Sequence, residues 1–209
     1  MHLVHRGIVN KKYKENLINS FKASFKKGYG IETDIHATLD NQFICFHDFT
    51  LKRIHNSNSS IKSLNYSQIK KLSDNKIPLL EDLLKISKNK FYLFIEIKPL
   101  LTIKLIKKLI KETKKFNKCV FISFKEKNIY RILKINKKIK VGLSFSPTTS
   151  INTIVKKSNN KYVNCLILDK FFLEKAQIQK IKKKKYFYTI KKKSDFRKYS
   201  NNNLIFENL

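Results

Sequence analysis

Hydrophobic residues follow two different spacings along this chain, and the two spacings alternate. Short apolar runs, each about the length of one buried strand, are separated by segments in which apolar residues recur every three or four positions, as on one face of a helix. In the segment 15–27, the residues at helical spacing are Leu17, Ile18, Phe21 and Phe25. The pattern predicts strands that alternate with helices through the whole chain.

Eight main strands follow from this pattern. They are expected at residues 2–5, 30–36, 91–97, 119–124, 140–145, 162–168, 186–190 and 203–206. The helices are expected at residues 15–27, 66–72, 79–86, 101–116, 126–135, 150–157 and 173–184, with a short turn or helix near 195–199. A further extended piece is expected at 43–46, and residues 49–65 have little periodicity and are expected to form a loop or a small excursion.

Eight repeats of strand and helix are typical of a closed parallel (β/α)8 barrel, the TIM barrel of the α/β class. The sequence shows no domain boundary and no internal repeat, so we expect a single domain over residues 1–209, a length that suits one such barrel. Because the sequence stops at the eighth strand, we expect the final helix to be missing or reduced to residues 208–209.

The composition adds a strong positive charge to this picture. Lys and Arg number 46 against 15 Asp and Glu, which gives a formal net charge of +31. Nearly all of these cations are Lys and are spread through the predicted helices, whereas proteins that read phosphates or bases by geometry tend to use Arg. We therefore expect a solvated basic surface that attracts anionic substrates, and no specific nucleic-acid partner.

The remaining composition excludes a disordered chain and a membrane-spanning one. Hydrophobic residues make up 42% of the chain, which is enough for a packed core. The apolar stretch 100–110 is interrupted by three Lys, so no transmembrane segment is expected, and the N-terminus lacks the pattern of a signal peptide. Three scattered Cys are expected as buried thiols in a reducing compartment, so the sequence predicts a cytoplasmic protein.

Polar residues gather where the first strands end, and in such a barrel the active site lies at that end. These residues are His5 and Arg6, Glu32 and Asp34, His47, and Glu96 and Lys98. Within the pairs at 32/34 and 96/98, the two residues are separated by one position and therefore share one face of a strand. All five His and nine of the fifteen acids lie within residues 1–98, so we expect the chemistry there.

Three carboxylates that converge at one end of a barrel repel one another unless a cation lies among them. Carboxylate oxygens suit Mg²⁺ or Ca²⁺ better than Zn²⁺, so we expect one divalent cation of this kind. Arg6 and Lys98 would help that cation to hold a phosphate, and the two histidines could share the roles of base and acid. The combination indicates cleavage of a phosphoester.

Each piece also has a simpler interpretation. A lone His at a strand end is commonly a hydrogen-bonded structural residue, and the pairs 32/34 and 96/98 could be solvent-facing charges or ion pairs of little energetic value. Taken together, these interpretations are weaker, because charges inside otherwise apolar strands are costly unless they are paired or bind a metal.

Five motifs in sequence resemble those of the glycerophosphodiester phosphodiesterase family. They are His5-Arg6-Gly7, Gly-Ile-Glu-Thr-Asp-Ile-His-Ala-Thr-Leu-Asp at 30–40, Phe46-His47-Asp48, Ile-Pro-Leu-Leu-Glu-Asp-Leu-Leu at 77–84, and Ile95-Glu96-Ile97-Lys98. Their order and spacing follow the family pattern over residues 5–98.

The resemblance implies a barrel enzyme that hydrolyses glycerophosphodiesters, its small-molecule substrates, to glycerol 3-phosphate and an alcohol. By the family pattern, the metal ligands would be Glu32, Asp34 and Glu96, the general acid and base would be His5 and His47, and the phosphate would be neutralised by Arg6 and Lys98. The family is thought to use the glycerol hydroxyl as an internal nucleophile, through a cyclic phosphate that water then opens. The oligomeric state is left open, with a dimer as one option.

The likeness decreases toward the C-terminus. The chain has Tyr188-Thr189-Ile190-Lys191 where the family usually has Trp-Thr-x-Asn, and Phe206-Glu207-Asn208-Leu209 where it usually has Thr-Asp-x-Pro. Since neither segment supplies a metal ligand or either of the two histidines, we expect the differences to affect the pocket wall and the preference for the alcohol.

Other polar residues near the motifs are given structural roles. We expect Asp48 to orient its loop or a neighbour, His36 to be a strand neighbour of the site, and His55 to lie in a loop. Asp169, after the sixth strand, is expected to cap a helix, although Asp169 and Glu174 could also touch substrate.

Three alternative functions stay open at this point. A sphingomyelinase D-like barrel would cleave phospholipid headgroups in the manner of a phospholipase D, but such enzymes usually have Asp at the third metal position, where this chain has Glu96. A non-catalytic basic protein would bind nucleic acid or a membrane surface through its Lys. A barrel without activity would account for the divergent C-terminal segments.

Overall fold

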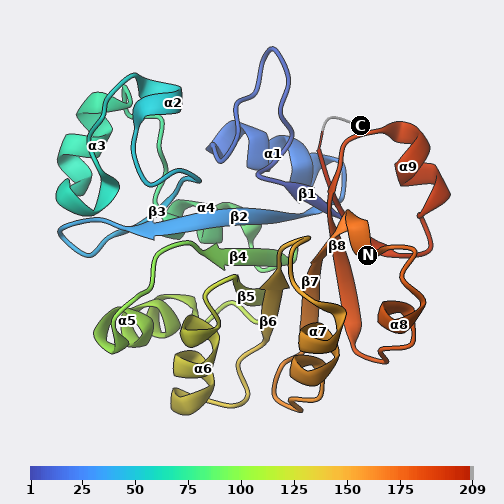
Figure 1. Cartoon of the computed structure of the whole chain (residues 1–209). Helices are drawn as coiled ribbons and strands as arrows, with labels where there is room; N and C mark the ends of the chain where they lie inside the picture. Colours follow the sequence, from blue (N-terminus) through green and yellow to red (C-terminus); the bar gives the residue numbers. More distant parts are fainter. Residues whose placement is uncertain (208–209) are drawn as a thin grey trace.

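Eight parallel strands close into a barrel in the computed structural model, which describes residues 1–207 (Figure 1). In order around the barrel they are β1 (Leu3–His5), β2 (Gly30–Ala37), β4 (Leu93–Ile97), β5 (Cys119–Ser123), β6 (Val141–Phe145), β7 (Cys165–Asp169), β8 (Lys184–Ile190) and β9 (Asn203–Phe206). Strand β9 pairs with β1 in parallel and completes the circle. The short strand β3 (Phe43–Cys45) runs antiparallel along β2 and adds an outer hairpin.

Helices cover the outside of the barrel, and Figure 1 shows α5 to α8 in a row beside strands β4 to β8. They are α1 (Ile18–Lys26), α4 (Leu80–Ser87), α5 (Ile103–Thr113), α6 (Glu126–Ile135), α7 (Ile151–Ser158), α8 (Ala176–Gln179) and α9 (Lys193–Lys198), with a short 3-10 turn, η2 (Lys170–Phe172), after β7. Helix α5 illustrates the pattern, because it buries Ile106 and Leu109. Its N-terminus is capped by Thr102, whose hydroxyl accepts a hydrogen bond from the Leu105 amide. The predicted (β/α)8 barrel is confirmed.

The segment between β3 and α4 forms the small excursion that was expected. It contains α2 (Lys52–His55), η1 (Ile61–Ser63) and α3 (Tyr66–Leu72). The excursion has its own small apolar core, built from Ile44, Phe46, Leu51, Ile61, Ile69 and Ile77. This core holds the segment that leads from β3 to His47 against the barrel.

The helix predicted at 173–184 is wrong. The chain forms η2 and the four-residue α8 instead, and β8 already begins at Lys184. Lys184 and Lys185 lie beside Cys165 and Leu166 in the parallel register of β7 and β8, so sheet pairing outweighs the helical preference of a Lys-rich segment. The prediction of a last helix reduced to 208–209 lies outside the described residues.

Apolar side chains fill the barrel on both faces of its strands. The larger core packs the outer faces of the strands against the helices, and a second cluster fills the barrel interior with residues such as Leu3, Phe94 and Ile167. On β1 and β4, the side chain that points into the barrel changes from apolar to polar or charged along the strand. Leu3 is followed on the same face by His5, and Phe94 by Glu96. The interior therefore changes from apolar to polar toward the carboxyl ends of these strands.

Two other predictions about the whole chain can be compared with the structure. The three Cys are free and buried, as expected. Among residues 1–207, none of the helices is both long enough and apolar enough to cross a bilayer.

Candidate active site

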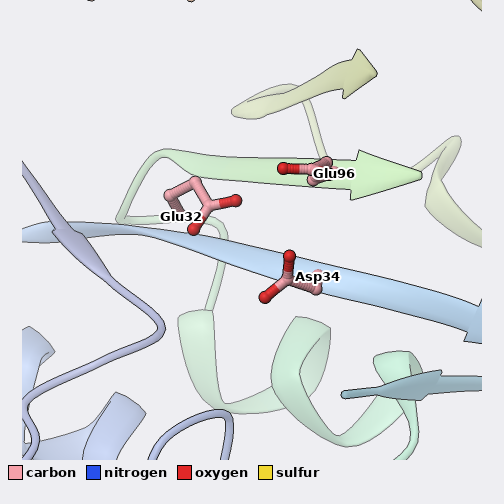
Figure 2. A group of neighbouring side chains, drawn as sticks. All are labelled: Glu32, Asp34 and Glu96. Atoms are coloured by element: carbon pink, nitrogen blue, oxygen red, sulfur yellow. The ribbon is translucent and has the colours of Figure 1, made fainter. Parts of the chain in front are cut away.

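Three carboxylates meet inside the barrel at the carboxyl ends of β2 and β4. Oxygens of Glu32, Asp34 and Glu96 lie within 4.8 Å of one another, as Figure 2 shows for the three side chains. All three side chains are buried or nearly so. Strand register explains the meeting, because Asp34 on β2 lies directly beside Glu96 on β4 and Glu32 is on the same face, one pleat earlier.

The electrostatics of this cluster are unequal. Burial, followed by repulsion from Asp34 and Glu96, raises the pKa of Glu32 well above its ordinary value. Burial and the Asp34 carboxylate also raise the pKa of Glu96, to about 7. Burial alone would raise the pKa of Asp34 as well, but Arg6 and Lys98 outweigh burial and lower it. Asp34 is therefore the carboxylate that the protein itself compensates most strongly.

The compensating groups come from β1, β4 and the loop before α1. Arg6 Nε lies 3.1 Å from Asp34 Oδ2, and Asn16, which is buried, donates from Nδ2 to the same oxygen at 3.1 Å. Lys98 Nζ lies 3.0 Å from Glu96 Oε1 and 3.5 Å from Asp34 Oδ1. Thr33 in turn donates to Asn16 Oδ1 at 2.8 Å and fixes the orientation of its amide.

Glu32 is left without such compensation. Its Oε2 atom is buried and has no hydrogen-bond partner among the described residues, and the nearest imidazole nitrogen, Nε2 of His5, is 3.7 Å away. A buried carboxylate oxygen of this kind is costly in the absence of a partner. Three carboxylates at this spacing match the donors that hard divalent cations prefer, so the residues present fit a bound Mg²⁺ or Ca²⁺.

The first imidazole of the site, His5, is held by a residue from the other end of the chain. Nδ1 of His5 donates to Oε2 of Glu207 at 2.9 Å, and Oε1 of Glu207 lies 2.6 Å from Lys191 Nζ. The hydrogen bond from His5, assisted by Lys191 and opposed by burial, lowers the pKa of Glu207 to about 2. The pairing of β1 with β9 brings these residues together across the closure of the barrel.

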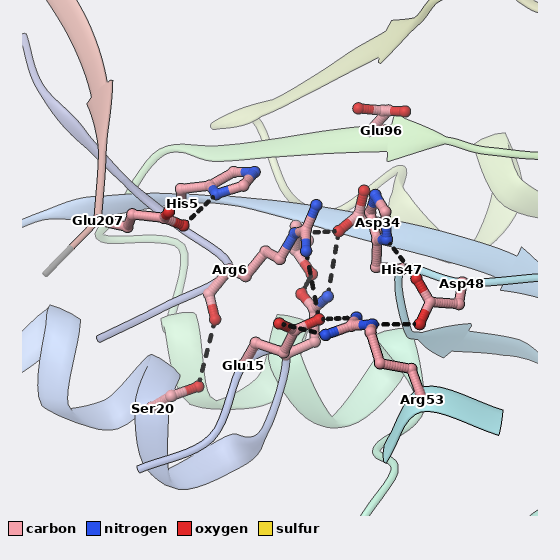
Figure 3. A network of polar contacts seen from close by, with 12 residues as sticks. His5, Arg6, Glu15, Ser20, Asp34, His47, Asp48, Arg53, Glu96 and Glu207 are labelled. Carbon is pink, nitrogen blue, oxygen red and sulfur yellow. Dashed lines mark hydrogen bonds and ion pairs between the residues drawn. The ribbon is translucent and has the colours of Figure 1, made fainter. Parts of the chain in front are cut away.

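The second imidazole, His47, is held in the same manner by its neighbour in the sequence. Nδ1 of His47 donates to Oδ1 of Asp48 at 2.6 Å, and Nε of Arg53 donates to the other oxygen of Asp48 at 2.6 Å. Arg53 also forms two hydrogen bonds with Glu15, at 2.6 and 3.2 Å. Burial lowers the pKa of His47, although the Asp34 charge and the hydrogen bond with Asp48 oppose that shift. Figure 3 shows both imidazoles with their carboxylate partners.

The turn after β1 needs a glycine to bring Arg6 to this place. Arg6 has a φ of 56° and Gly7 a φ of 77°, so both residues are in the left-handed region. A Cβ atom on Gly7 would come within 2.6 Å of the Ser20 hydroxyl oxygen. Glycine therefore lets the chain turn sharply against α1 while the Arg6 amide keeps its hydrogen bond to the Glu32 carbonyl oxygen at 2.8 Å.

A cavity of about 200 Å³ opens beside these groups. Six of the seven predicted site residues line it, namely His5, Arg6, Glu32, His47, Glu96 and Lys98, and the seventh, Asp34, belongs to the adjoining carboxylate cluster. The opposite wall is apolar and includes Ile122, Ile167 and the rings of Phe124 and Tyr188. The centres of these two rings are 5.9 Å apart in an edge-to-face arrangement, and the Tyr188 hydroxyl donates a hydrogen bond to the Phe145 carbonyl oxygen.

The structural roles expected for Asp48, His36 and Asp169 are those found, whereas His55, expected in a loop, is the last residue of helix α2. Asp48 orients His47, and His36 lies buried with Nε2 donating to the His47 carbonyl oxygen at 3.1 Å. Burial lowers the pKa of His36 to about 4, so it is neutral when it makes this bond. Asp169 caps η2 by accepting from the Phe171 amide at 2.8 Å, and Glu174 is paired with Lys198.

The expectation that the chemistry lies within residues 1–98 leaves out one contact, because Glu207, from the divergent C-terminal segment, contacts His5. Tyr188, from the other divergent segment, lines the cavity, in keeping with the expectation that these segments affect the pocket wall. Sequence reasoning also missed the contribution of Glu15, Asn16 and Arg53. A signal for Glu207 was present, because it directly follows the eighth strand at the same end of the barrel; Glu15 and Asn16 precede a helix and carry no such signal.

Comparison with known proteins is consistent with this geometry. A model of the family described as "Glycerophosphoryl diester phosphodiesterase family" matches residues 5–199. No curated protein sequence matches the chain.

Solved structures of two bacterial glycerophosphodiester phosphodiesterases are similar to the chain. That from Thermotoga maritima is 22% identical, with a TM-score of 0.81 over 98% of this chain and 92% of that chain. That from Parabacteroides distasonis is 21% identical, with a TM-score of 0.78 over 98% and 91%. A phosphodiesterase from Oleispira antarctica, solved with the product sn-glycerol-3-phosphate, is 21% identical, with a TM-score of 0.83 over 99% and 92%. At these identities the structural likeness shows the shared fold.

Proposed function

The chain belongs to the glycerophosphoryl diester phosphodiesterase family and is an enzyme of that class, and on this premise we propose how its site works. The proposed reaction is the hydrolysis of a glycerophosphodiester to glycerol 3-phosphate and an alcohol, with one divalent cation, Mg²⁺ or Ca²⁺, and with His5 and His47 as general acid and base. One observation carries the proposal: a cluster of three carboxylates lies at one cavity with two imidazoles, each of which is fixed by a carboxylate of its own.

The proposed metal ligands are Glu32, Asp34 and Glu96. The unpartnered buried oxygen of Glu32 and the mutual proximity of the three side chains support this role. When bound, the cation would stabilise negative charge on a phosphoryl oxygen and orient the phosphate. The remaining chemistry depends on the side chains around it.

Arg6 and Lys98 are proposed to neutralise the phosphate. Both line the cavity, and both are already held in place by Asp34, at 3.1 Å from Arg6 and 3.5 Å from Lys98. Arg6 is held from its far side as well, because its Nη1 donates to Glu15 at 3.3 Å. Two side chains fixed in this way bind a phosphate with little further loss of conformational freedom.

His5 and His47 are proposed to move the protons. Each imidazole donates from Nδ1 to a carboxylate, so Nε2 is the nitrogen left for proton transfer. As the nucleophilic oxygen forms its new bond to phosphorus, one histidine takes the proton from that oxygen. As the bond between phosphorus and the alcohol oxygen breaks, the other histidine, which enters this step as an imidazolium protonated on both nitrogens, gives its Nε2 proton to the departing alcohol.

The apolar wall of Ile122, Ile167 and the two rings would limit access of water to the opposite side of the phosphate. Charges that face such a wall interact more strongly than they would in bulk water. The same wall is therefore proposed to contact the organic part of the substrate and to influence the preference for the alcohol.

A coupled assay for glycerol 3-phosphate tests the proposal directly. Purified protein is incubated with glycerophosphocholine or glycerophosphoethanolamine, with Mg²⁺ or Ca²⁺ and in excess chelator. We expect release of glycerol 3-phosphate that the chelator stops, and a loss of about 10²–10⁴ in rate for His47→Ala, as for the removal of a proton-transfer group. His55→Ala is the matched control, because His55 lies outside the cavity and should keep the wild-type rate. Full activity of His47→Ala, or full activity in chelator, would contradict the proposal.

A further inference from the structure

Exposed aromatic side chains gather at the mouth of the barrel. Phe49, Phe124 and Phe171 are 52%, 44% and 54% exposed, and they are the only phenylalanines among the exposed large hydrophobic residues of 1–207. Phe124 directly follows β5 and Phe171 follows β7, while Phe49 comes two residues after His47, which lines the cavity. Phe124 and Phe171 lie at the same end of the barrel as the candidate site, because the loops that follow parallel barrel strands share one end. Phe49 lies at that end too, because its ring contacts Lys125, the residue after Phe124.

Two aliphatic side chains extend this surface. Leu100, three residues after β4, is 46% exposed, and Ile103, the first residue of α5, is 52% exposed. Apolar side chains exposed together on one face commonly mark a binding surface, whereas single ones need no explanation.

Lysines lie against the exposed rings. Nζ of Lys125 is 5.4 Å from the centre of the Phe49 ring, and Lys125 also follows Phe124 in the sequence. Nζ of Lys175 is 4.4 Å from the centre of the Phe171 ring. Phe49 and Phe171 therefore each have an ammonium group beside the ring, so the surface offers apolar and cationic contacts within a few ångströms of each other.

This combination fits the boundary between headgroups and acyl chains of an anionic membrane. There, aromatic and aliphatic side chains enter the apolar edge while Lys binds anionic headgroups. Protein–protein interfaces deplete Lys at their centres, and single-stranded nucleic acid uses rings and cations but gains nothing from exposed Leu100 and Ile103.

We propose that this mouth surface, composed of Phe49, Leu100, Ile103, Phe124 and Phe171 with Lys125 and Lys175, docks on an anionic phospholipid bilayer. In the docked state the cavity opens toward the headgroup layer, where phosphodiesters are concentrated. The inference goes beyond the hydrolytic reaction and does not depend on it, because docking is measured without substrate.

Vesicle sedimentation tests the proposal. Full-length protein is mixed with vesicles of phosphatidylglycerol and phosphatidylcholine in equal parts, or of phosphatidylcholine alone, at physiological ionic strength. We expect binding to the anionic vesicles, and a loss of about tenfold in the partition constant for each of Phe49→Ser and Phe171→Ser. The pair Lys125→Gln and Lys175→Gln should lower it by about fivefold per residue.

Matched controls separate this surface from the general charge of the protein. Tyr130→Ser and Val155→Ser remove exposed apolar side chains on α6 and α7, and Lys138→Gln with Lys182→Gln removes two exposed cations outside the mouth loops. Both control pairs should bind vesicles almost as the wild type does.

Three results would overturn the proposal. The first is no binding to anionic vesicles. The second is equal binding by the phenylalanine pair and its control pair, which would mean adsorption by net charge from any face. The third is a single-stranded oligonucleotide bound more weakly by the phenylalanine variants while vesicle binding is unchanged, which would assign the surface to nucleic acid.

Discussion

The two halves of the barrel mouth are built from opposite kinds of side chain. Strands β1, β2 and β4 present imidazole, carboxylate and ammonium groups, whereas the interior of β5, β7 and β9 presents Ile122, Ile167 and Ile205. The boundary is sharp, because Asp34 lies beside Glu96 in the strand register and Glu96 lies beside Ile122. The change from charged to apolar interior side chains therefore falls between the neighbouring strands β4 and β5.

This difference shows how the protein tolerates buried charge. The groups that compensate Asp34 are Arg6, Asn16 and Lys98, and all of them come from the charged half or the loop next to it. The interior side chains of the apolar half carry no charge, so they can pack as an ordinary core. The charges near that half, on Glu207 and Lys191, come just after β9 and β8 and pair with each other. Substitutions in the charged half should therefore mainly lower activity, and substitutions in the apolar half should mainly lower the free energy of unfolding.

Glu32→Gln is the change with the largest expected effect on function. It removes one of three proposed cation ligands, which should cost several kcal/mol of transition-state stabilisation and lower kcat/KM by about a thousandfold or more. In metal-free protein the same change should raise the melting temperature, because it removes a buried carboxylate that repels its neighbours. Steady-state kinetics and thermal unfolding with and without Mg²⁺ measure the two effects.

The increase in melting temperature that Mg²⁺ gives to the wild type should also shrink in Glu32→Gln. Glu112→Gln is the control, because this half-buried carboxylate is paired with Lys108 on α5 and lies outside the cluster. An unchanged response to Mg²⁺ in Glu32→Gln would show that Glu32 is not a ligand.

Ile167→Ala tests the apolar half in the opposite direction. The side chain is 3% exposed, and its truncation should lower the free energy of unfolding by about 2–5 kcal/mol. The value of kcat should fall far less than in Glu32→Gln, because Ile167 lines the cavity but carries neither charge nor proton. Denaturant unfolding and kinetics on the folded fraction measure both. A loss of kcat as large as that of Glu32→Gln, at unchanged stability, would mean that the two halves do not divide the work in this way.

The sequence predicts most of the fold because the barrel strands are buried on both faces. Such strands are continuous apolar runs, and the predicted strand at 203–206 coincides with β9. The error at 173–184 has a clear origin. Lys182 to Lys185 contain no apolar residue, so the sequence does not show where a helix would end and where β8 begins. Local pattern cannot predict that pairing with β7 decides the conformation of Lys184 and Lys185.

The candidate site is predictable as far as its residues carry local motifs. Glu32 shares one strand face with Asp34 at a spacing of two, and Glu96 does so with Lys98, which is visible in the sequence. The partner of His5 is different, because Glu207 is 202 residues away and meets His5 only after β9 has closed the barrel against β1. The sequence indicates that Glu207 lies at the same end of the barrel, but its contact with His5 depends on barrel closure, which no spacing in the sequence encodes.

Glu207→Gln asks whether the divergent C-terminal segment contributes to the charged half. Glutamine keeps the size of the side chain but removes the charge that orients His5, so kcat should fall by about ten- to a hundredfold, as for carboxylates that orient metal-bound imidazoles. KM should stay nearly constant, since Glu207 is not among the residues that line the cavity. Lys191→Gln removes the exposed partner of Glu207 but keeps its carboxylate, and it should retain most of the activity. Equal kcat values for Glu207→Gln and the wild type would confine Glu207 to a structural role.

Arg53→Lys should have the smallest effect, and it tests how far the charged half extends into the excursion. The Arg53 guanidinium joins Asp48 to Glu15 with three hydrogen bonds, a geometry that lysine cannot reproduce. Because the side chain is 49% exposed, water and salt screen these pairs, and loss of the fork should lower kcat by at most about fivefold, the range of exposed ion pairs. Lys85→Ala breaks the exposed pair with Glu81 on α4 and should leave kcat unchanged. A loss of kcat for Arg53→Lys that grows as salt is lowered would show that Arg53 acts electrostatically on His47. Equal kcat values for both variants at all salt concentrations would show that, beyond Asp48, no charge of this network affects His47.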